Sequence, residues 1–589
     1  MATVRAVKTG IWSDTTVWNT GSLPTTVDDV YSNTFTVTVD IDVTVLSINN
    51  NATTGVNAGG VFITTGSNNR GITATNGFTA VASTSTPVFR HQGSGTTTLT
   101  GDLRTLGGNN STVFLESSGN LIINGNLITS GAGHINMLIG SSGNVTVNGN
   151  VTTASVNNPS MTNASLVGTL TINGNITFNG GTCISNGSGN VAIVGNITAN
   201  GGTVIANTSG IVSISGGTYS SSGGAILSNT TGTVTINGNT SATSTSSIVG
   251  IITNSGSGII TFIGSITNNL TGQPANLVVN SGSGIINVIG DLIGASIGNN
   301  ATSRTISNSS NGTINVTGNL LTGGASATGT PSISVVIDNS GGGIVNVTGT
   351  ANGASSGLFT SANTVNAIRN SSTGTINIIG NCLGTHIRKS GQGSFIILSA
   401  VYNVAGGIVN ITGNAIGGST GLAVGNAGTG TVTVNGNAIG GTGWFAIEGV
   451  NSAGNTIIEK AIYSNLGQSP LNGYIKFKTT NPQIDVIRED NVTVTLRDPL
   501  NVTGLLPTTS DVRSGTTYNS GSSTGTLAMP APNLVQLGVP VGATFGTANL
   551  TPGDFWNYLI SNGFTTGSIG ERLKESATTD IVGKLIQSF

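Results

Sequence analysis

A short phrase of alternating apolar residues followed by Gly-Asn recurs through the middle of this 589-residue chain. The clearest copies read apolar-x-apolar-Asn-Gly-Asn and occupy 121–126, 145–150, 170–175, 234–239 and 432–437. The glycines of these and looser copies are Gly101, Gly125, Gly149, Gly174, Gly195, Gly216, Gly238, Gly264, Gly290, Gly318, Gly349, Gly380, Gly413 and Gly436. Their intervals range from 21 to 33 residues. Repeats of this length indicate a solenoid, in which successive coils stack in a row.

Within each phrase the apolar residues lie two apart, as Ile314 and Val316 do, which is the period of a β-strand with one buried face. A second apolar run, such as 225–229, precedes most phrases, so each coil is expected to hold two or three strands. Asn-Gly suits the turns between them, and stacked asparagines would form hydrogen-bonded ladders. We predict an all-β parallel β-helix (β-solenoid) of about 14 or more coils. The alternative is an antiparallel sandwich array or a β-prism.

Charge is scarce and unevenly distributed. Charged residues are 6% of the chain; ten lie within 101–450, whereas nineteen lie in the last 139 residues. Disorder goes with low hydrophobicity and high net charge, but here 36% of residues are hydrophobic and the net charge is −2. We expect an N-terminal β cap (1–60), the solenoid (61–455), a β-rich C-terminal cap (456–510) and a C-terminal module of β-structure and short helices (511–589).

Composition also argues against several classes of protein. The near-neutral charge and the lack of a basic run predict no nucleic-acid partner, and no stretch is apolar enough to suggest a membrane partner. No apolar segment follows Arg5 and Lys8, so no secretion signal is predicted.

Cys183 and Cys382 fall about eight coils apart on a solenoid and cannot pair within one chain. The acids of calcium-binding repeats are missing, so neither a metal nor a cofactor is predicted.

The two ends of the chain differ from the repeats. Trp12 and Trp18 are expected to cover the open end of the first coil, with an aromatic sugar-binding platform as the alternative. At the other end, 551–554 and 568–571 are helix-start patterns. They predict short helices whose apolar faces pack on the chain itself or on copies of it. The residues predicted to carry assembly are Phe555, Trp556, Leu559, Leu585, Ile586 and Phe589.

A resemblance follows from these ends. The stretches 511–518, 525–532, 537–540, Phe555-Trp556 and 568–574 resemble a C-terminal module of tailed-bacteriophage virion proteins. The segment from Trp12 to Val30 is similar to the start of phage and bacterial surface β-helices. The resemblance covers about 120 residues and implies a virion structural protein, a fibre or spike-like appendage that is usually trimeric. It further implies assembly in the host cytoplasm, contact with other virion proteins, and attachment to the host surface. Many tail fibres begin with a dedicated N-terminal attachment domain, whereas this sequence is expected to enter its cap within a dozen residues.

Two alternatives stay open. One is a tailspike that hydrolyses or eliminates polysaccharide, but only Asp102 and Glu116 are acids within one coil length in the solenoid, and a glycosidase needs two neighbouring carboxylates. The dense polar cluster His386, Arg388 and Lys389 is interpreted as a solvated loop. The other alternative is a capsid decoration protein or bacterial adhesin. We predict no catalytic residues, and we place any contact with a host-surface glycan at Trp444 and Phe445.

Overall fold

The computed structural model describes most of residues 3–463 and parts of 510–547. The gaps in the first range are 52–58, 82–85, 107–112, 130–136, 141, 154–160, 164–166, 223, 243–249, 269–274, 295–301, 323–332, 354–357, 360–364, 385–387, 390–397, 419–420, 442–445, 449–454 and 459–461. The second range lacks 511, 513, 519–522, 529, 536–539, 542–543 and 546. The chain forms two compact units, Met1–Thr495 and Leu496–Phe589.

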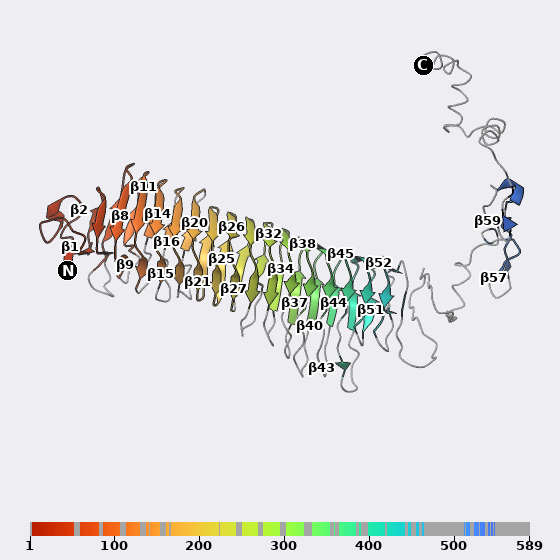
Figure 1. Cartoon of the computed structure of the whole chain (residues 1–589). Coiled ribbons are helices and arrows are strands. Elements are labelled where there is room, and N and C mark those ends of the chain that lie inside the picture. Colours follow the sequence, from red (N-terminus) through yellow and green to blue (C-terminus); the bar gives the residue numbers. More distant parts are fainter. Residues whose placement is uncertain are drawn as a thin grey trace, which may run out of the picture. The chain divides into compact units, whose positions relative to one another are not determined.

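The first unit is a parallel β-helix, as the repeat predicts (Figure 1). Each coil contributes one strand to each of three sheets, and each strand pairs in parallel with its counterparts in the coils before and after it.

Sheet 1 has nineteen strands in the described residues. They are β1 (Thr3–Arg5), β3 (Asp29–Tyr31), β6 (Ser47–Asn49), β9 (Phe78–Ala80), β12 (Leu103–Thr105), β15 (Leu127–Thr129), β18 (Val151–Thr153), β21 (Ile176–Phe178), β24 (Ile197–Ala199), β27 (Tyr219–Ser221), β30 (Thr240–Ala242), β33 (Ile266–Asn268), β36 (Leu292–Ile293), β39 (Leu320–Leu321), β42 (Ala351–Asn352), β46 (Cys382–Leu383), β50 (Ala415–Ile416), β53 (Ala438–Ile439) and β56 (Ile462–Tyr463).

Sheet 2 lies on a second side of the coil. Its strands are β2 (Gly10–Ile11), β4 (Thr36–Thr38), β7 (Val61–Thr64), β10 (Phe89–His91), β13 (Val113–Leu115), β16 (Met137–Ile139), β19 (Met161–Asn163), β22 (Thr182–Asn186), β25 (Gly202–Asn207), β28 (Gly224–Asn229), β31 (Ile252–Asn254), β34 (Ala275–Asn280), β37 (Thr302–Asn308), β40 (Ile333–Asn339), β44 (Val365–Asn370), β48 (Leu398–Asn403), β51 (Leu422–Asn426) and β54 (Ile447–Glu448).

Sheet 3 contains the apolar part of the recurring phrase. Its strands are β5 (Val43–Val45), β8 (Arg70–Ala74), β11 (Thr96–Thr100), β14 (Asn120–Asn124), β17 (Val145–Asn148), β20 (Thr169–Asn173), β23 (Asn190–Val194), β26 (Ile211–Ser215), β29 (Thr233–Asn237), β32 (Ile259–Ile263), β35 (Ile285–Ile289), β38 (Thr313–Thr317), β41 (Ile344–Thr348), β45 (Thr375–Ile379), β49 (Ile408–Thr412), β52 (Thr431–Val434) and β55 (Asn455–Ile458).

The Gly-Asn pair forms the corner between sheet 3 and sheet 1, and its glycines stack. A Cβ added to Gly290, for example, would lie 2.0 Å from the carbonyl oxygen of Gly264 in the preceding coil, so no side chain fits there. The structure corrects one member of the predicted series, because Gly217 rather than Gly216 occupies the stack, above Gly195 and below Gly238. Two adjacent glycines made the repeat ambiguous at this point.

Variation in coil length lies mainly in one part of the coil. The stretch from the last residue of a sheet 2 strand to the corner glycine is ten residues in every coil from Asn254–Gly264 to Asn426–Gly436. In some earlier coils it differs by one residue, with nine from Asn186 to Gly195. The stretch from the corner glycine to the end of the next sheet 2 strand grows from 12 residues, Gly195 to Asn207, to 23, Gly380 to Asn403. The extra residues of the long coils therefore lie between sheets 1 and 2. Two of these long connections contribute β43 (Leu358–Phe359) and β47 (Arg388–Lys389), which pair in parallel.

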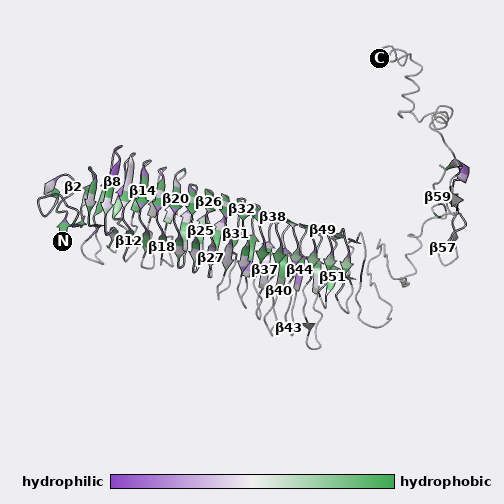
Figure 2. Ribbon diagram, viewed as in Figure 1, coloured by the Kyte–Doolittle hydropathy of each residue, from purple (hydrophilic) through white to green (hydrophobic). Residues whose placement is uncertain are grey.

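The core lies inside the coils. Inward residues of all three sheets form one continuous cluster, to which most sheet 3 strands contribute a pair such as Ile260 and Phe262. Hydrophobic segments recur in the strands along the whole unit (Figure 2). Burial of this apolar surface drives the folding of a chain with so few charges.

The N-terminal end is closed by tryptophans. Trp12 and Trp18 lie beside the short helix η1 (Thr15–Val17), are 1% and 2% exposed, and pack edge to face at 4.8 Å. Trp12 also packs against Phe62 of the third sheet 2 strand at 5.8 Å. Their burial leaves no face for a sugar platform. The parallel ladders cross the predicted boundary at residue 60, because β4 pairs with β7.

In the second unit, β57 (Thr517–Tyr518) pairs antiparallel with β58 (Ser523–Thr524), and β59 (Pro540–Val541) with β60 (Thr544–Phe545). Between these two strand pairs, the described residues include a 3-10 turn, η4 (Pro532–Leu534). The helices predicted within 551–589 lie outside the described residues.

Candidate functional site

The predicted glycan contact and assembly residues cannot be placed. Trp444 and Phe445 lie outside the described residues, as do Phe555, Trp556, Leu559, Leu585, Ile586 and Phe589 and the histidine of the polar cluster, His386. Arg388 and Lys389 form β47, but the structure describes only their backbone. The candidate site must therefore be sought among the polar side chains of the described coils.

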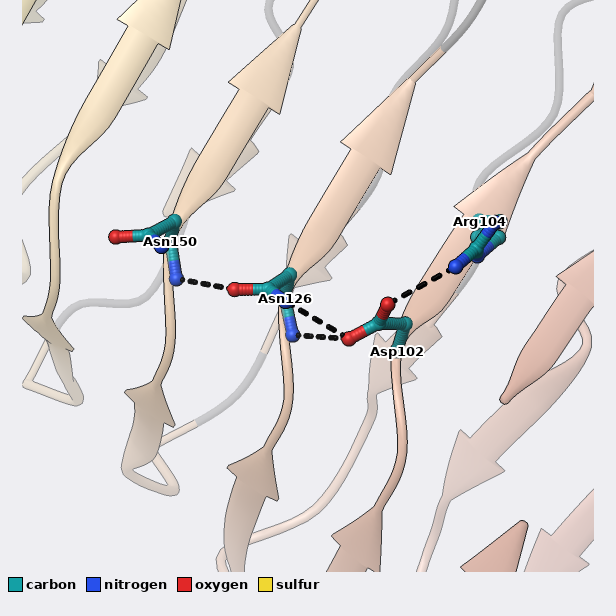
Figure 3. A network of polar contacts seen from close by, with 4 residues as sticks. All are labelled: Asp102, Arg104, Asn126 and Asn150. Carbon is teal, nitrogen blue, oxygen red and sulfur yellow. Dashed lines mark hydrogen bonds and ion pairs between the residues drawn. The ribbon is translucent and has the colours of Figure 1, made fainter. Parts of the chain in front are cut away.

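A polar ladder runs along the corner between sheets 3 and 1. At most corners, the side-chain oxygen of the residue after the glycine accepts the backbone N–H of its counterpart in the next coil, as Asn126 accepts from Asn150 at 2.8 Å and Asn150 from Asn175 at 2.9 Å. Asp102 begins this ladder and accepts both the backbone and side-chain N–H of Asn126, at 3.0 and 2.9 Å (Figure 3). The asparagine of the recurring phrase therefore satisfies a backbone donor that would otherwise lack a partner.

Two acids that stood out in the sequence belong to this ladder. Asp102 and Asp291 each directly follow a corner glycine, and Asp291 accepts the backbone N–H of Asn319 at 2.7 Å. Burial, the largest influence, acts to raise the pKa of Asp102. The hydrogen bonds from Asn126 and Arg104 together outweigh it, so this pKa is lowered. A general acid needs the opposite shift, so Asp102 has the properties of a structural carboxylate.

Asp102 and Glu116 do not form a carboxylate pair. Glu116 follows the sheet 2 strand β13 and binds Arg90 at 3.3 Å and Gln92 at 2.8 Å. Asp102 lies at the opposite end of sheet 3, bound to Arg104 at 3.0 Å. A five-residue sheet 3 strand separates the two corners, which corresponds to about 16 Å. This exceeds the roughly 5–10 Å between the carboxylates of a glycosidase.

A second ladder, which the sequence analysis did not identify, lies inside the coil at the end of sheet 2. Its members are Asn163, Asn186, Asn207, Asn229, Asn254, Asn280, Asn308, Asn339, Asn370, Asn403 and Asn426. Each of these buried asparagines after the first donates to the carbonyl of a glycine three or four residues on, as Asn229 does to Gly232 at 2.9 Å. Most also donate to the next asparagine, as Asn186 does to Asn207 at 2.7 Å. The sequence signal was an Asn followed three or four residues later by Gly.

His91 occupies the same column nearer the N-terminus. Its Nε2 bonds the carbonyl of Gly95 at 3.0 Å, which is the bond that the asparagines make, and its Nδ1 faces the hydroxyls of Thr64 and Thr97 at 2.7 and 3.0 Å. Burial lowers the pKa of His91. These contacts fix the neutral tautomer with a proton on Nε2, so His91 acts here as a ladder residue.

The most buried ion network crosses three coils of sheet 2. Asp338 of β40 is 2% exposed; its Oδ2 accepts from Nε of Arg304 (β37) at 2.5 Å, and its Oδ1 lies 3.9 Å from Nη1 of Arg369 (β44). Asp338 and Arg369 are register partners and are 31 residues apart, which is the local coil length. The repeat interval applied to the charges would therefore have predicted this pair.

The remaining reactive groups are enclosed. Cys183 and Cys382 are free and buried, and burial raises the pKa of Cys183 to about 12 and that of Cys382 further. The described residues include no group of three or more His, Cys, Asp or Glu side chains placed to hold a metal ion. Among them, no helix is long and apolar enough to cross a membrane.

Comparison with known proteins finds no matching family model, curated protein or solved structure. The polar side chains described above bond to their counterparts in adjacent coils. Such an arrangement holds coils in register and presents few groups for chemistry.

Proposed function

We propose that this chain is a structural protein of a tailed-bacteriophage particle, a fibre or spike-like appendage of the tail or head that mediates attachment to the host surface. The proposal assigns the β-helix the role of a stiff spacer. It assigns contact with other virion proteins to the C-terminal module and places the protein in the virion as a homotrimer.

The observation that carries the spacer role is the continuity of the ladders. Three parallel sheets connect successive coils, and the glycine stack and two asparagine ladders add contacts between most of them. Each coil contacts only its neighbours and is hydrogen-bonded to them in all three sheets. Bending such a body would therefore break many hydrogen bonds at once. The phage assignment rests on the resemblance of residues 511–589.

The test is the position of the protein in an intact particle. We expect antibodies raised against the solenoid to label purified virions, and cryo-electron microscopy to show rods attached through the C-terminal module. A truncation after residue 510 should leave the solenoid folded but absent from particles. Finding the full chain only in the soluble fraction of the lysate, or finding the truncated chain in particles, would overturn the proposal.

Contact with host glycan is assigned to Trp444 and Phe445. We expect the Trp444→Ala variant to lose binding on a glycan array by about fivefold, because packing on an aromatic ring contributes on the order of 1 kcal/mol. The matched control is Phe114→Ala, which removes an outward-facing aromatic side chain from sheet 2 and should leave binding unchanged. An array signal that Trp444→Ala leaves unchanged would show that the contact lies elsewhere.

A further inference from the structure

The outward side of sheet 3 is an unusually apolar surface. Of the sixteen large hydrophobic residues exposed in the described part of the chain, nine lie on strands β23 to β49 of this sheet. They are Val194, Ile211, Ile259, Ile263, Ile285, Ile289, Ile344, Ile379 and Ile408, which are between 37% and 58% exposed. Isolated exposed aliphatic residues need no explanation, whereas a contiguous patch marks an interaction surface.

The register arranges these residues in columns. The first outward position of successive strands runs Ile211, Thr233, Ile259, Ile285, Thr313, Ile344, Thr375, Ile408 and Thr431. The last position carries Ile263, Ile289, Thr317, Thr348, Ile379 and Thr412 over the later strands. Between them lies a column of Asn287, Asn315, Asn346, Asn377 and Asn410. We call the outward side of strands β23 to β52 of sheet 3 the Ile–Asn face.

The asparagines of this face bond to one another. Asn315 donates to Asn287, Asn346 to Asn315 and Asn377 to Asn346, each at 2.8 Å, and Asn410 donates to Asn377 at 2.9 Å. Removing water from an amide that is already hydrogen-bonded costs less free energy than removing it from an unpaired amide. Asparagine ladders beside stacked aliphatic side chains are the composition of the dry interfaces between paired β-sheets.

We propose that the Ile–Asn face is the surface at which copies of this chain pack against one another. Its columns repeat once per coil, and only another stacked-coil surface has the same repeat. No residue of the ten strands is charged. Two copies of the face therefore do not repel each other electrostatically, and a charged partner would find no opposite charge to pair with. Ten strands at about 4.8 Å, each about 16 Å long, cover on the order of 770 Å². A stable interface buries about 800 Å² per partner.

The near-constant length of the stretch that contains sheet 3 favours such packing. Extra residues in the long coils lie between sheets 1 and 2, so they do not interrupt the Ile–Asn face. The inference is independent of any place in a virus particle, because it concerns the purified chain alone.

The test measures the mass of the full chain by sedimentation velocity. For the natural sequence we expect the mass of an oligomer, that is, a multiple of 58.4 kDa greater than the monomer mass. A triple variant, Ile211→Lys, Ile289→Lys and Ile379→Lys, should shift it to a 58.4 kDa monomer with an unchanged circular dichroism spectrum. The matched control puts the same charges on sheet 1 of the same coils, as Ser220→Lys, Ile293→Lys and Leu383→Lys, and should keep the natural mass. A monomeric natural chain, or a face variant that stays assembled, would overturn the proposal.

A labelling experiment covers the case in which the lysine variants fail to fold. Thr317→Cys places a thiol on the Ile–Asn face, and Thr152→Cys places one at an equally exposed position on sheet 1. The natural cysteines are fully buried and should not react. We expect maleimide to label Thr317→Cys at least tenfold more slowly than Thr152→Cys in the assembled protein. Equal rates would contradict packing through this face.

Discussion

Single residues in this protein act mainly by satisfying backbone groups of the next coil. The recurring Gly-Asn illustrates this, because the glycine allows the close approach of two backbones and the asparagine accepts the N–H that the corner exposes. Asp102 and Asp291 take the asparagine position without changing the bond. A chain with few carboxylates thus uses two of them for ladder bonds, and this weakens the case for polysaccharide hydrolysis.

His91 makes a prediction at this scale. Its folded pKa is lowered below the usual 6.5, mainly by burial, so the unfolded chain binds a proton that the folded chain does not. Stability contributed by His91 is therefore complete above pH 6.5 and is lost as the pH falls from 6.5 toward the folded pKa. We expect the thermal midpoint to drop between pH 7 and pH 5. The His91→Asn variant, which restores the ladder residue, should show a smaller drop; an identical drop would exclude His91 as the cause.

At the scale of elements, the strands differ in what their outward sides do. Sheet 3 is uncharged from β23 to β52, whereas sheet 2 carries the Arg304–Asp338–Arg369 network and is preceded in each coil by the connection of variable length. A buried carboxylate between two guanidinium groups keeps three strands in register only if all its partners are present.

The Asp338→Asn variant tests this network. Removing the charge leaves two nearby arginines without compensation, and we expect a loss of about 1–3 kcal/mol in the free energy of unfolding, since both arginines are partly exposed. The control is Glu116→Gln, which removes a half-exposed pair and should change stability by about 0–1 kcal/mol. The measurement is urea denaturation followed by circular dichroism. Equal effects of the two variants would show that burial of Asp338 is energetically unimportant.

At the scale of the whole molecule, the first unit is one-dimensional. Each coil contacts only its neighbours, so damage at one end should remain local. The tryptophan cap is the place where this matters most, because Trp12 closes the apolar interior of the first coils.

We therefore expect Trp12→Ala to cost about 3–5 kcal/mol locally, the usual effect of truncating a buried aromatic residue. Hydrogen exchange measured by mass spectrometry should accelerate over strands β1 to β8. Strands β32 to β49 serve as the internal control and should exchange at the natural rate. Acceleration along the entire unit would contradict one-dimensional behaviour.

The sequence by itself determined the parallel β-helix and the corner glycines, because strand period and turn chemistry are local properties. The pairing of Asp338 with Arg369 followed from the coil interval and could have been predicted. Only the tertiary structure decided that Gly217 rather than Gly216 stacks, that His91 stands in for an asparagine, and that nine exposed aliphatic residues share one face. These facts depend on register between coils. Register is set partly by connections whose length varies from coil to coil, and no local sequence pattern predicts the conformation of these connections.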